Sequence, residues 1–349
     1  MIELQGNELV FRFPEVHEGA VCRISFQRTM RIPDDNRDYP LPAGLGRFPL
    51  AHVRHHADRL PSGWSEHGGV LLPMYQAEAM WIEFSSRWRR SYPCAVKIAA
   101  GKINAVSGTP WSESLTDQPQ DYVVIPGQPW LDGFNVGEGL IRQFVAMPLG
   151  EGYTAEEQLT GAAEHGGLQI IVYPMKRERY EAKLKAEAEA RERYKAAIKA
   201  GVEFEEVAFQ RWGDFKCATK PRSMGLAPGG LMRQSIFIDL EGIEAWDQAN
   251  PSRCFVHILN SEQWQAATGQ LTPGTPLTAA DYADAGMPWF EYYSDSGAAA
   301  GAKPLAQLDS VAAMGVKLGQ KPLPENEAIT PSVVILLGPT ADVVQDGQW

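Results

Sequence analysis

An eleven-residue segment occurs twice in this chain, and this repeat constrains the fold more than any other feature of the sequence. The first copy, GLIRQFVAMPL, occupies residues 139–149, and the second, GLMRQSIFIDL, occupies residues 230–240. Seven of the eleven positions are identical or near-identical. Internal repetition is typical of structures built from related units. The repeat therefore predicts two related β-rich lobes that arose by duplication, and the alternative is chance similarity between two amphipathic strands.

The distribution of glycine and proline favours strands over helices. The 349 residues include 33 glycines and 25 prolines, which separate short apolar runs throughout both halves of the chain. Such punctuation is typical of strands joined by turns and loops. We expect a β-rich α+β fold with two sandwich-like, mostly antiparallel lobes over 1–173 and 202–349, with short capping helices. A single large α+β domain with an inserted helix is the alternative.

Residues 174–201 differ from the rest and predict one long charged helix that connects the lobes. The stretch 175–200 is rich in Ala, Glu, Lys and Arg and contains no Gly or Pro. Its apolar stripe is narrow and is interrupted by Glu187 and Arg191, which indicates a surface position. Either the helix simply links the lobes, or it forms a contact with a second copy or another protein. The predicted interface residues are Tyr180, Leu184, Tyr194 and Ile198.

Charge and cysteine usage narrow the function classes. The formal net charge of -11 opposes binding to a phosphate backbone, so we expect no nucleic-acid partner. No apolar stretch is long enough to span a membrane, and the N-terminus lacks a signal-peptide pattern, which together predict a cytoplasmic protein. The four cysteines include no C-x-x-C pair, which favours buried free thiols over zinc or disulfides.

Four of the seven histidines lie within sixteen residues and form a candidate metal site. If 50–60 is helical, His52 and His56 stand one turn apart and can share zinc or a similar divalent ion, with His67 as a third ligand. The glutamate of an H-E-x-x-H motif is missing, and nearby arginines oppose a cation. The alternative is a solvated polar surface, and we otherwise expect no cofactor.

Aromatic residues and the repeated arginines form a candidate ligand site. Ten tryptophans are present, several beside loop-forming residues, and exposed aromatic rings can stack on sugars. The repeated arginines could form a pseudo-symmetric cleft, although inter-strand contacts are the simpler explanation. The candidate binding residues are Trp111, Trp130, Arg142, Arg233, Trp289 and Tyr292.

These observations leave three functional hypotheses. The first is a non-enzymatic cytoplasmic structural or interaction protein that self-assembles or binds a partner through the long helix. The second is a glycan- or small-ligand-binding protein, in one variant hydrolytic, that uses Trp-rich loops. The third is a metal-dependent enzyme that uses the histidine cluster. The sequence has no phosphate-binding loop and no nucleophile elbow, and the first hypothesis accounts for most of its features.

Overall fold

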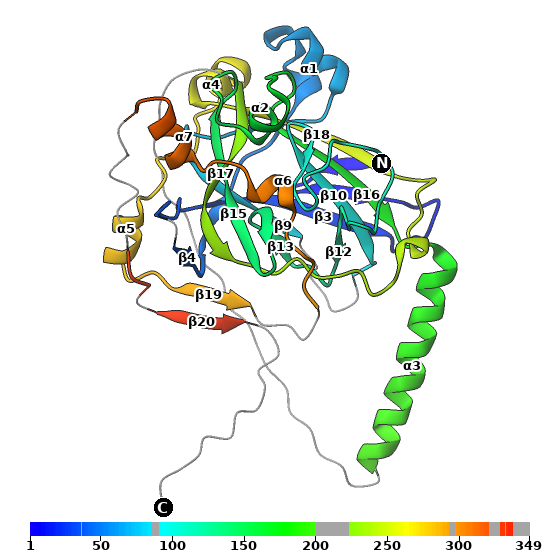
Figure 1. The fold of residues 1–349 in the computed structure, drawn as a ribbon. Coiled ribbons are helices and arrows are strands. Elements are labelled where there is room, and N and C mark those ends of the chain that lie inside the picture. The colour runs from blue at the N-terminus through cyan, green and yellow to red at the C-terminus, as the bar shows by residue number, and fades with distance from the viewer. Residues whose placement is uncertain are drawn as a thin grey trace, which may run out of the picture.

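A computed structural model describes residues 1–35, 37–84, 91–199, 223–292, 297–320, 329–331 and 333–337, without the side chains of 194–199. Most of the described chain belongs to one large sheet (Figure 1). Its seventeen strands are β1 (Ile2–Leu4), β2 (Leu9–Arg12), β3 (Val21–Thr29), β4 (Asp38–Tyr39), β6 (Gly44–Arg47), β7 (Ala51–His52), β8 (Val70–Pro73), β9 (Ala79–Phe84), β10 (Cys94–Ala100), β11 (Ile103–Asn104), β12 (Val123–Ile125), β13 (Trp130–Leu131), β14 (Gly133–Gly137), β15 (Leu140–Pro148), β16 (Leu168–Pro174), β17 (Ser223–Arg233) and β18 (Ser252–Leu259).

The pairing of the strands is mostly antiparallel, as the sequence predicts. A continuous path of hydrogen-bonded neighbours runs β1–β2–β3–β9–β15–β17–β18–β16–β10. Among the strands described, the parallel pairs of this sheet are β17 with β4 and β18 with β8. A second sheet contains β5 (Leu41–Pro42), β19 (Trp289–Tyr292) and β20 (Val334–Leu337). Strands from both sides of the long helix thus share one sheet.

The two copies of the repeated segment meet where β15 pairs with the end of β17, which contains residues 230–233 of the second copy (Figure 1). Leu140 pairs with Arg233, Ile141 with Met232, and Arg142 with Leu231. Ile141 and Met232 occupy equivalent positions in the two copies, so the antiparallel register has a local two-fold symmetry about this pair. The division of the chain into two lobes at 173 and 202 stays a prediction.

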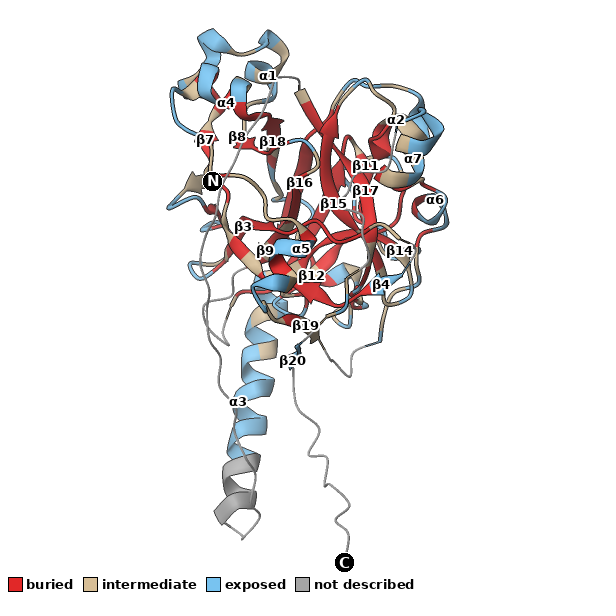
Figure 2. Ribbon diagram, turned by 90° about the vertical axis from the view of Figure 1, so that its left-hand side faces the viewer, coloured by how far each residue is buried: buried red, intermediate tan, exposed pale blue. Residues whose placement is uncertain are grey.

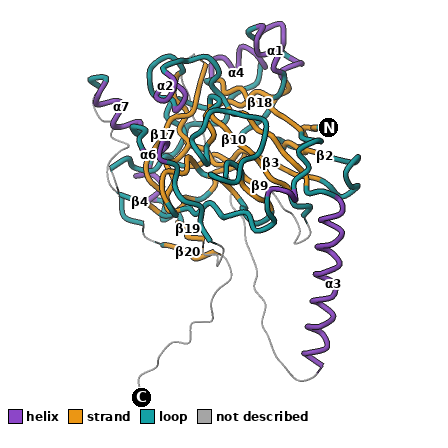
Figure 3. The backbone as a smooth tube through the Cα atoms, turned by 45° about the vertical axis from the view of Figure 1, so that its right-hand side comes forward, coloured by secondary structure: helices purple, strands orange, loops and turns teal. Residues whose placement is uncertain are grey.

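Most of the described helices lie around the periphery of the sheet (Figure 3). Besides three short 3-10 helices, they are α1 (Ser62–His67), α2 (Ala155–Thr160), α3 (Arg177–Lys199), α4 (Ser261–Thr268), α5 (Ala279–Asp284), α6 (Lys303–Ala306) and α7 (Val311–Lys317). Capping boxes are present at Thr154 and Thr278, where each threonine oxygen accepts a hydrogen bond from the backbone N–H three residues on.

The predicted long helix is present as α3, and it extends away from the sheet with most of its described side chains exposed (Figure 2). Tyr180, in its first turn, stacks on Tyr92 with ring centroids 4.2 Å apart and contacts His17 edge-on. Lys183 forms an ion pair with Glu241. These two contacts hold the helix to the rest of the chain near its N-terminal end.

The prediction of a helix over 50–60 is wrong. Ala51 and His52 form β7, which pairs with β8, and two 3-10 turns, Val53–His55 and Ala57–Arg59, follow. The backbone N–H of Val53 also donates to Gly69, 3.2 Å away. A strand partner distant in sequence thus satisfies backbone groups that the local apolar periodicity assigned to a helix.

The sheet strands supply a large apolar core cluster with smaller clusters beside it, and Figure 2 shows this buried interior. Trp246, Trp264 and Trp289 are completely buried. Cys22, Cys94 and Cys254 are buried free thiols, as the sequence predicts, and Cys217 lies outside the described residues. Among the helices described, none is long and apolar enough to cross a membrane.

Candidate ligand-binding pocket

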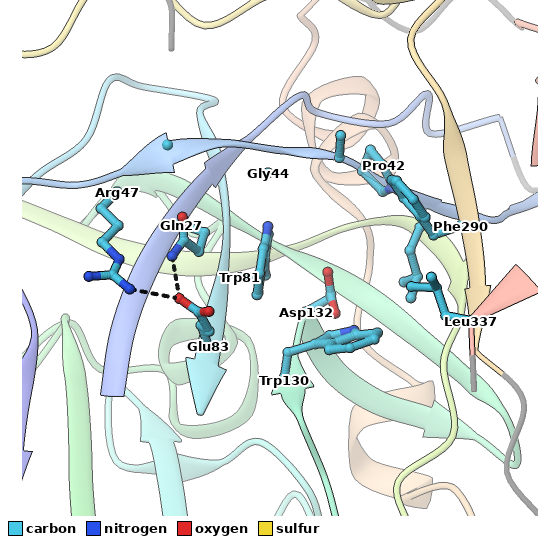
Figure 4. A pocket seen from close by; sticks show the side chains of 13 residues that line it. Gln27, Pro42, Gly44, Arg47, Trp81, Glu83, Trp130, Asp132, Phe290 and Leu337 are labelled. Atoms are coloured by element: carbon cyan, nitrogen blue, oxygen red, sulfur yellow. Dashed lines mark hydrogen bonds and ion pairs between the residues drawn. The ribbon is translucent and has the colours of Figure 1, made fainter. Parts of the chain in front are cut away.

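A pocket of about 490 Å³ opens where the small sheet meets one side of the large sheet (Figure 4). Strands β3, β6, β9 and β13, together with Asp132 between β13 and β14, supply its polar residues and both tryptophans. The small sheet supplies the apolar wall. The lining residues are Gln27, Leu41, Pro42, Ala43, Gly44, Gly46, Arg47, Trp81, Glu83, Trp130, Asp132, Phe290 and Leu337.

Two tryptophans form an aromatic corner in this pocket. The ring centroids of Trp81 and Trp130 lie 6.3 Å apart, with the ring planes inclined by 68°. Gly44 lies against the Trp81 ring, since a Cβ there would meet that ring at 3.0 Å. Tyr292 supports Trp130 with an edge contact at 5.2 Å. Perpendicular contacts are a favourable arrangement for aromatic pairs, so each ring is held in a defined orientation.

The polar end of the pocket contains Glu83, whose carboxylate has hydrogen-bond donors and a basic group among the neighbouring side chains. Its carboxylate accepts hydrogen bonds from Ser25 at 2.7 Å and from Gln27 at 2.6 Å, and it lies 3.5 Å from Arg47. Arg47 also lies 3.4 Å from Glu8. The negative charge of Glu83 is therefore compensated within the protein, as the dashed lines in Figure 4 show.

Asp132 is the second acidic group of the pocket, and its environment is different. Its side chain is 2% exposed, and its Oδ2 accepts a 2.6 Å hydrogen bond from the Gln234 amide. The Gln234 carbonyl accepts in turn from the Asp132 backbone N–H. Burial raises the pKa of Asp132 to about 7, and the hydrogen bond from Gln234 lowers it only in part.

The two repeated glutamines each hold another segment of the chain, and Gln234 holds the pocket residue Asp132. Gln143 accepts from the backbone N–H of Ile32 and donates to the Met30 carbonyl, each at 3.0 Å. Gln234 holds Asp132 through the same two kinds of bond, one accepted by its carbonyl and one donated by its amide. Both glutamines are buried, Gln143 on β15 and Gln234 directly after β17. The repeated segment thus contributes to the pocket through Gln234.

The two arginines predicted to bind ligand lie outside the lining of this pocket. Arg142 donates to the Gly229 carbonyl at 3.1 Å and lies 3.7 Å from Asp34. Arg233 is partly exposed and forms ion pairs with Asp38 and Glu291. Both therefore make contacts within the chain, which is the simpler of the two explanations that the sequence left open.

The four predicted aromatic binding residues are divided between different regions. Trp130 lines the pocket and contacts Tyr292. Trp289 is buried between Tyr39 and Tyr282. Trp111 packs against the main core, with the Lys97 ammonium 5.9 Å from its ring. Of these four residues, Trp130 lines the pocket and Tyr292 contacts it from outside the lining.

The predicted histidine ligands lie on different elements. The His52 ring lies 4.8 Å from that of His55, whereas His67 stacks on Phe255 at 5.3 Å. Across the described residues, no group of three or more His, Cys, Asp or Glu side chains is placed to hold a metal ion. Burial, and then the nearby His55 and Arg54, lower the pKa of His52. Metal binding by His52, His56 and His67 stays a prediction.

Trp81, Glu83, Gln27 and Asp132 are pocket residues that the sequence analysis missed. Trp81 and Glu83 alternate with buried residues along β9, a pattern that identifies one face of a strand but no ligand. Asp132 precedes Gly133, where a Cβ would lie 1.9 Å from the Arg142 carbonyl oxygen. The sequence shows a glycine at this position, but the close backbone approach that requires it becomes apparent only from the pairing of β14 with β15.

The chain matches no protein-family model, no curated protein and no solved structure.

Proposed function

We propose that this protein binds a small organic ligand in the pocket between Trp81, Trp130 and Asp132. The observation that carries the proposal is the combination of two inclined indole rings with a buried carboxyl group in one cavity of about 490 Å³. Ligand sites in proteins are typically cavities of this size, apolar for the most part, with a few placed polar groups. A sugar ring, with one apolar face and several hydroxyl groups, belongs to the ligand classes that such a pocket accommodates.

The test compares two tryptophan variants in a binding screen. Trp130→Ala removes a ring that lines the pocket, whereas Trp111→Ala removes a half-buried ring that does not. We would screen neutral sugars and small organic cations by calorimetry against the intact protein and both variants. A ligand of this pocket should bind the Trp111 variant normally and the Trp130 variant about tenfold or more weakly, since an aromatic contact contributes about 1–3 kcal/mol. Equal affinities for the two variants would refute the proposal.

We further propose a second function, in which α3 forms a contact between copies of the protein. The supporting observation is that α3 has a net charge of +3, from eight basic and five acidic residues, in a chain whose net charge is -11. A basic helix that extends from an acidic protein complements the surface of a second copy. Leu184 is 39% exposed and available for such a contact. Tyr180 packs on its own chain, and the side chains of Tyr194 and Ile198 lie outside the described part of the structure.

The local two-fold symmetry in the pairing of the repeated segments supports the further proposal of two related lobes.

Native mass spectrometry tests this contact. Leu184→Ser should shift the mass distribution towards monomer, because it removes apolar area from the helix surface. Leu159→Ser is a matched control, since Leu159 is 37% exposed and lies on α2. An intact protein that is monomeric throughout the micromolar range would refute the assembly proposal, as would an equal response of the two variants.

A further inference from the structure

Resting on the proposed ligand-binding function of this pocket, we infer that its ligand carries an alkylated ammonium group, which lies in the corner between Trp81, Trp130 and Asp132. The inference specifies the ligand class, and it separates a cationic ligand from the neutral sugar considered above.

The orientation of the aromatic rings is the first argument. The ring planes of Trp81 and Trp130 are inclined by 68°, so they border a corner from two directions (Figure 4). A sugar ring stacks its one apolar face on one aromatic ring, whereas a rounded ammonium group can contact two inclined rings together. Indole is the most favourable aromatic partner for a cation. The geometry of this pair therefore fits a compact cation better than a sugar ring.

The uncompensated charge of Asp132 is the second argument. A buried carboxylate is stable only with a counter-charge or several hydrogen bonds. Asp132 is 2% exposed and receives one side-chain hydrogen bond, from Gln234, and no cationic side chain pairs with it in the part of the chain that the structure describes. Glu83, by contrast, has Arg47 beside it. An ammonium ligand would supply the counter-charge that Asp132 lacks.

Among the ionisable residues that line the pocket, Asp132 is the one whose charge no neighbouring side chain in the described ranges balances. The other ionisable residues that line the pocket are Glu83 and Arg47, which lie 3.5 Å apart as an ion pair. Their opposite charges largely cancel at the distance of a ligand. The net charge of the chain, -11, adds a long-range attraction for cations.

The experiment uses calorimetry with choline and its neutral isostere 3,3-dimethylbutan-1-ol, which has the same shape without the charge. Choline should bind the intact protein at least about tenfold more tightly than the isostere, because a desolvated cation–aromatic contact and a charge-assisted pair are both absent from the neutral compound. Asp132→Asn preserves the side-chain shape and should weaken choline binding by at least about tenfold while leaving the isostere unaffected. Asp38→Asn removes a charge that does not line the pocket and should change neither affinity markedly.

The dependence of affinity on pH provides a readout that a structural role of Asp132 would not produce. A cation requires the ionised carboxylate, so choline affinity should rise about tenfold from pH 6 to pH 8. A neutral ligand that accepts a hydrogen bond from the protonated acid would show the opposite trend.

Equal binding of choline and its isostere, or an unchanged affinity for choline in Asp132→Asn, would overturn the inference. If methyl glucosides bind in a Trp130-dependent manner and choline does not, the pocket remains a ligand site and only the cation assignment falls. If neither class binds, the ligand-binding proposal falls with it.

Discussion

Replacing Asp132 by asparagine should change how the stability of the protein depends on pH. The pKa of this buried carboxyl is raised from an ordinary value of 3.8 to about 7. Because the folded-state pKa is the higher one, the folded state binds the proton more tightly than the unfolded state does. The favourable contribution is complete below about pH 3.8 and is lost as pH rises through 7. A shift of about 3 units corresponds to about 4 kcal/mol, an upper bound for the change in unfolding free energy.

Asparagine cannot ionise, so the variant should lack this loss. Its extra amide hydrogens lack a partner, which costs about 1–3 kcal/mol at every pH. The free energy of unfolding of Asp132→Asn minus that of the intact protein should therefore increase by up to about 4 kcal/mol between pH 4 and pH 8. This difference removes the effects of other titrating groups, because they are common to both proteins.

Urea unfolding at half-unit steps from pH 4 to pH 9 measures this difference directly. Asp58→Asn is the control, because the Asp58 side chain is 75% exposed and its surface ion pair with Arg59 contributes about 1 kcal/mol or less. The reasoning would be refuted by a difference between the intact protein and Asp132→Asn that stays constant across this range, because Asp132 would then titrate alike in the folded and unfolded states.

Two other positions allow tests by the same unfolding assay. His257 is 2% exposed between Trp64 and Phe255, and burial lowers its pKa from 6.5 to about 4. The free energy of unfolding should therefore fall by up to about 3 kcal/mol as pH drops from 6.5 to 4. His257→Phe should reduce this pH dependence, and an unchanged dependence would exclude His257 as its source. Gly133→Ala places a Cβ 1.9 Å from a backbone carbonyl oxygen and should destabilise the protein by at least about 2 kcal/mol. Gly63→Ala, in helix α1 with open space around it, should be neutral or stabilising. Equal urea unfolding midpoints for the two variants would contradict the close approach at Gly133.

The sequence determined the features of this protein that depend on neighbouring residues. The capping boxes at Thr154 and Thr278 are formed within four consecutive residues, so their side chains identify them directly. The long run of helix-forming residues predicted α3, and frequent glycine and proline between short apolar runs predicted a strand-rich chain. Each of these outcomes follows from local backbone preferences, which the amino-acid order contains.

The tertiary structure alone decided which strands pair, and the pocket depends on that pairing. The segment 50–60 has helical periodicity, but β7 pairs with β8 and satisfies its backbone groups. The repeat was visible in the sequence, yet the direct pairing of its copies, and the burial of its glutamines beside Asp132 and Ile32, were not. Trp81 lies on β9, whereas Trp130 and Asp132 lie two residues apart at β13, and only the pairing of β13 with β9 brings the two segments into one site.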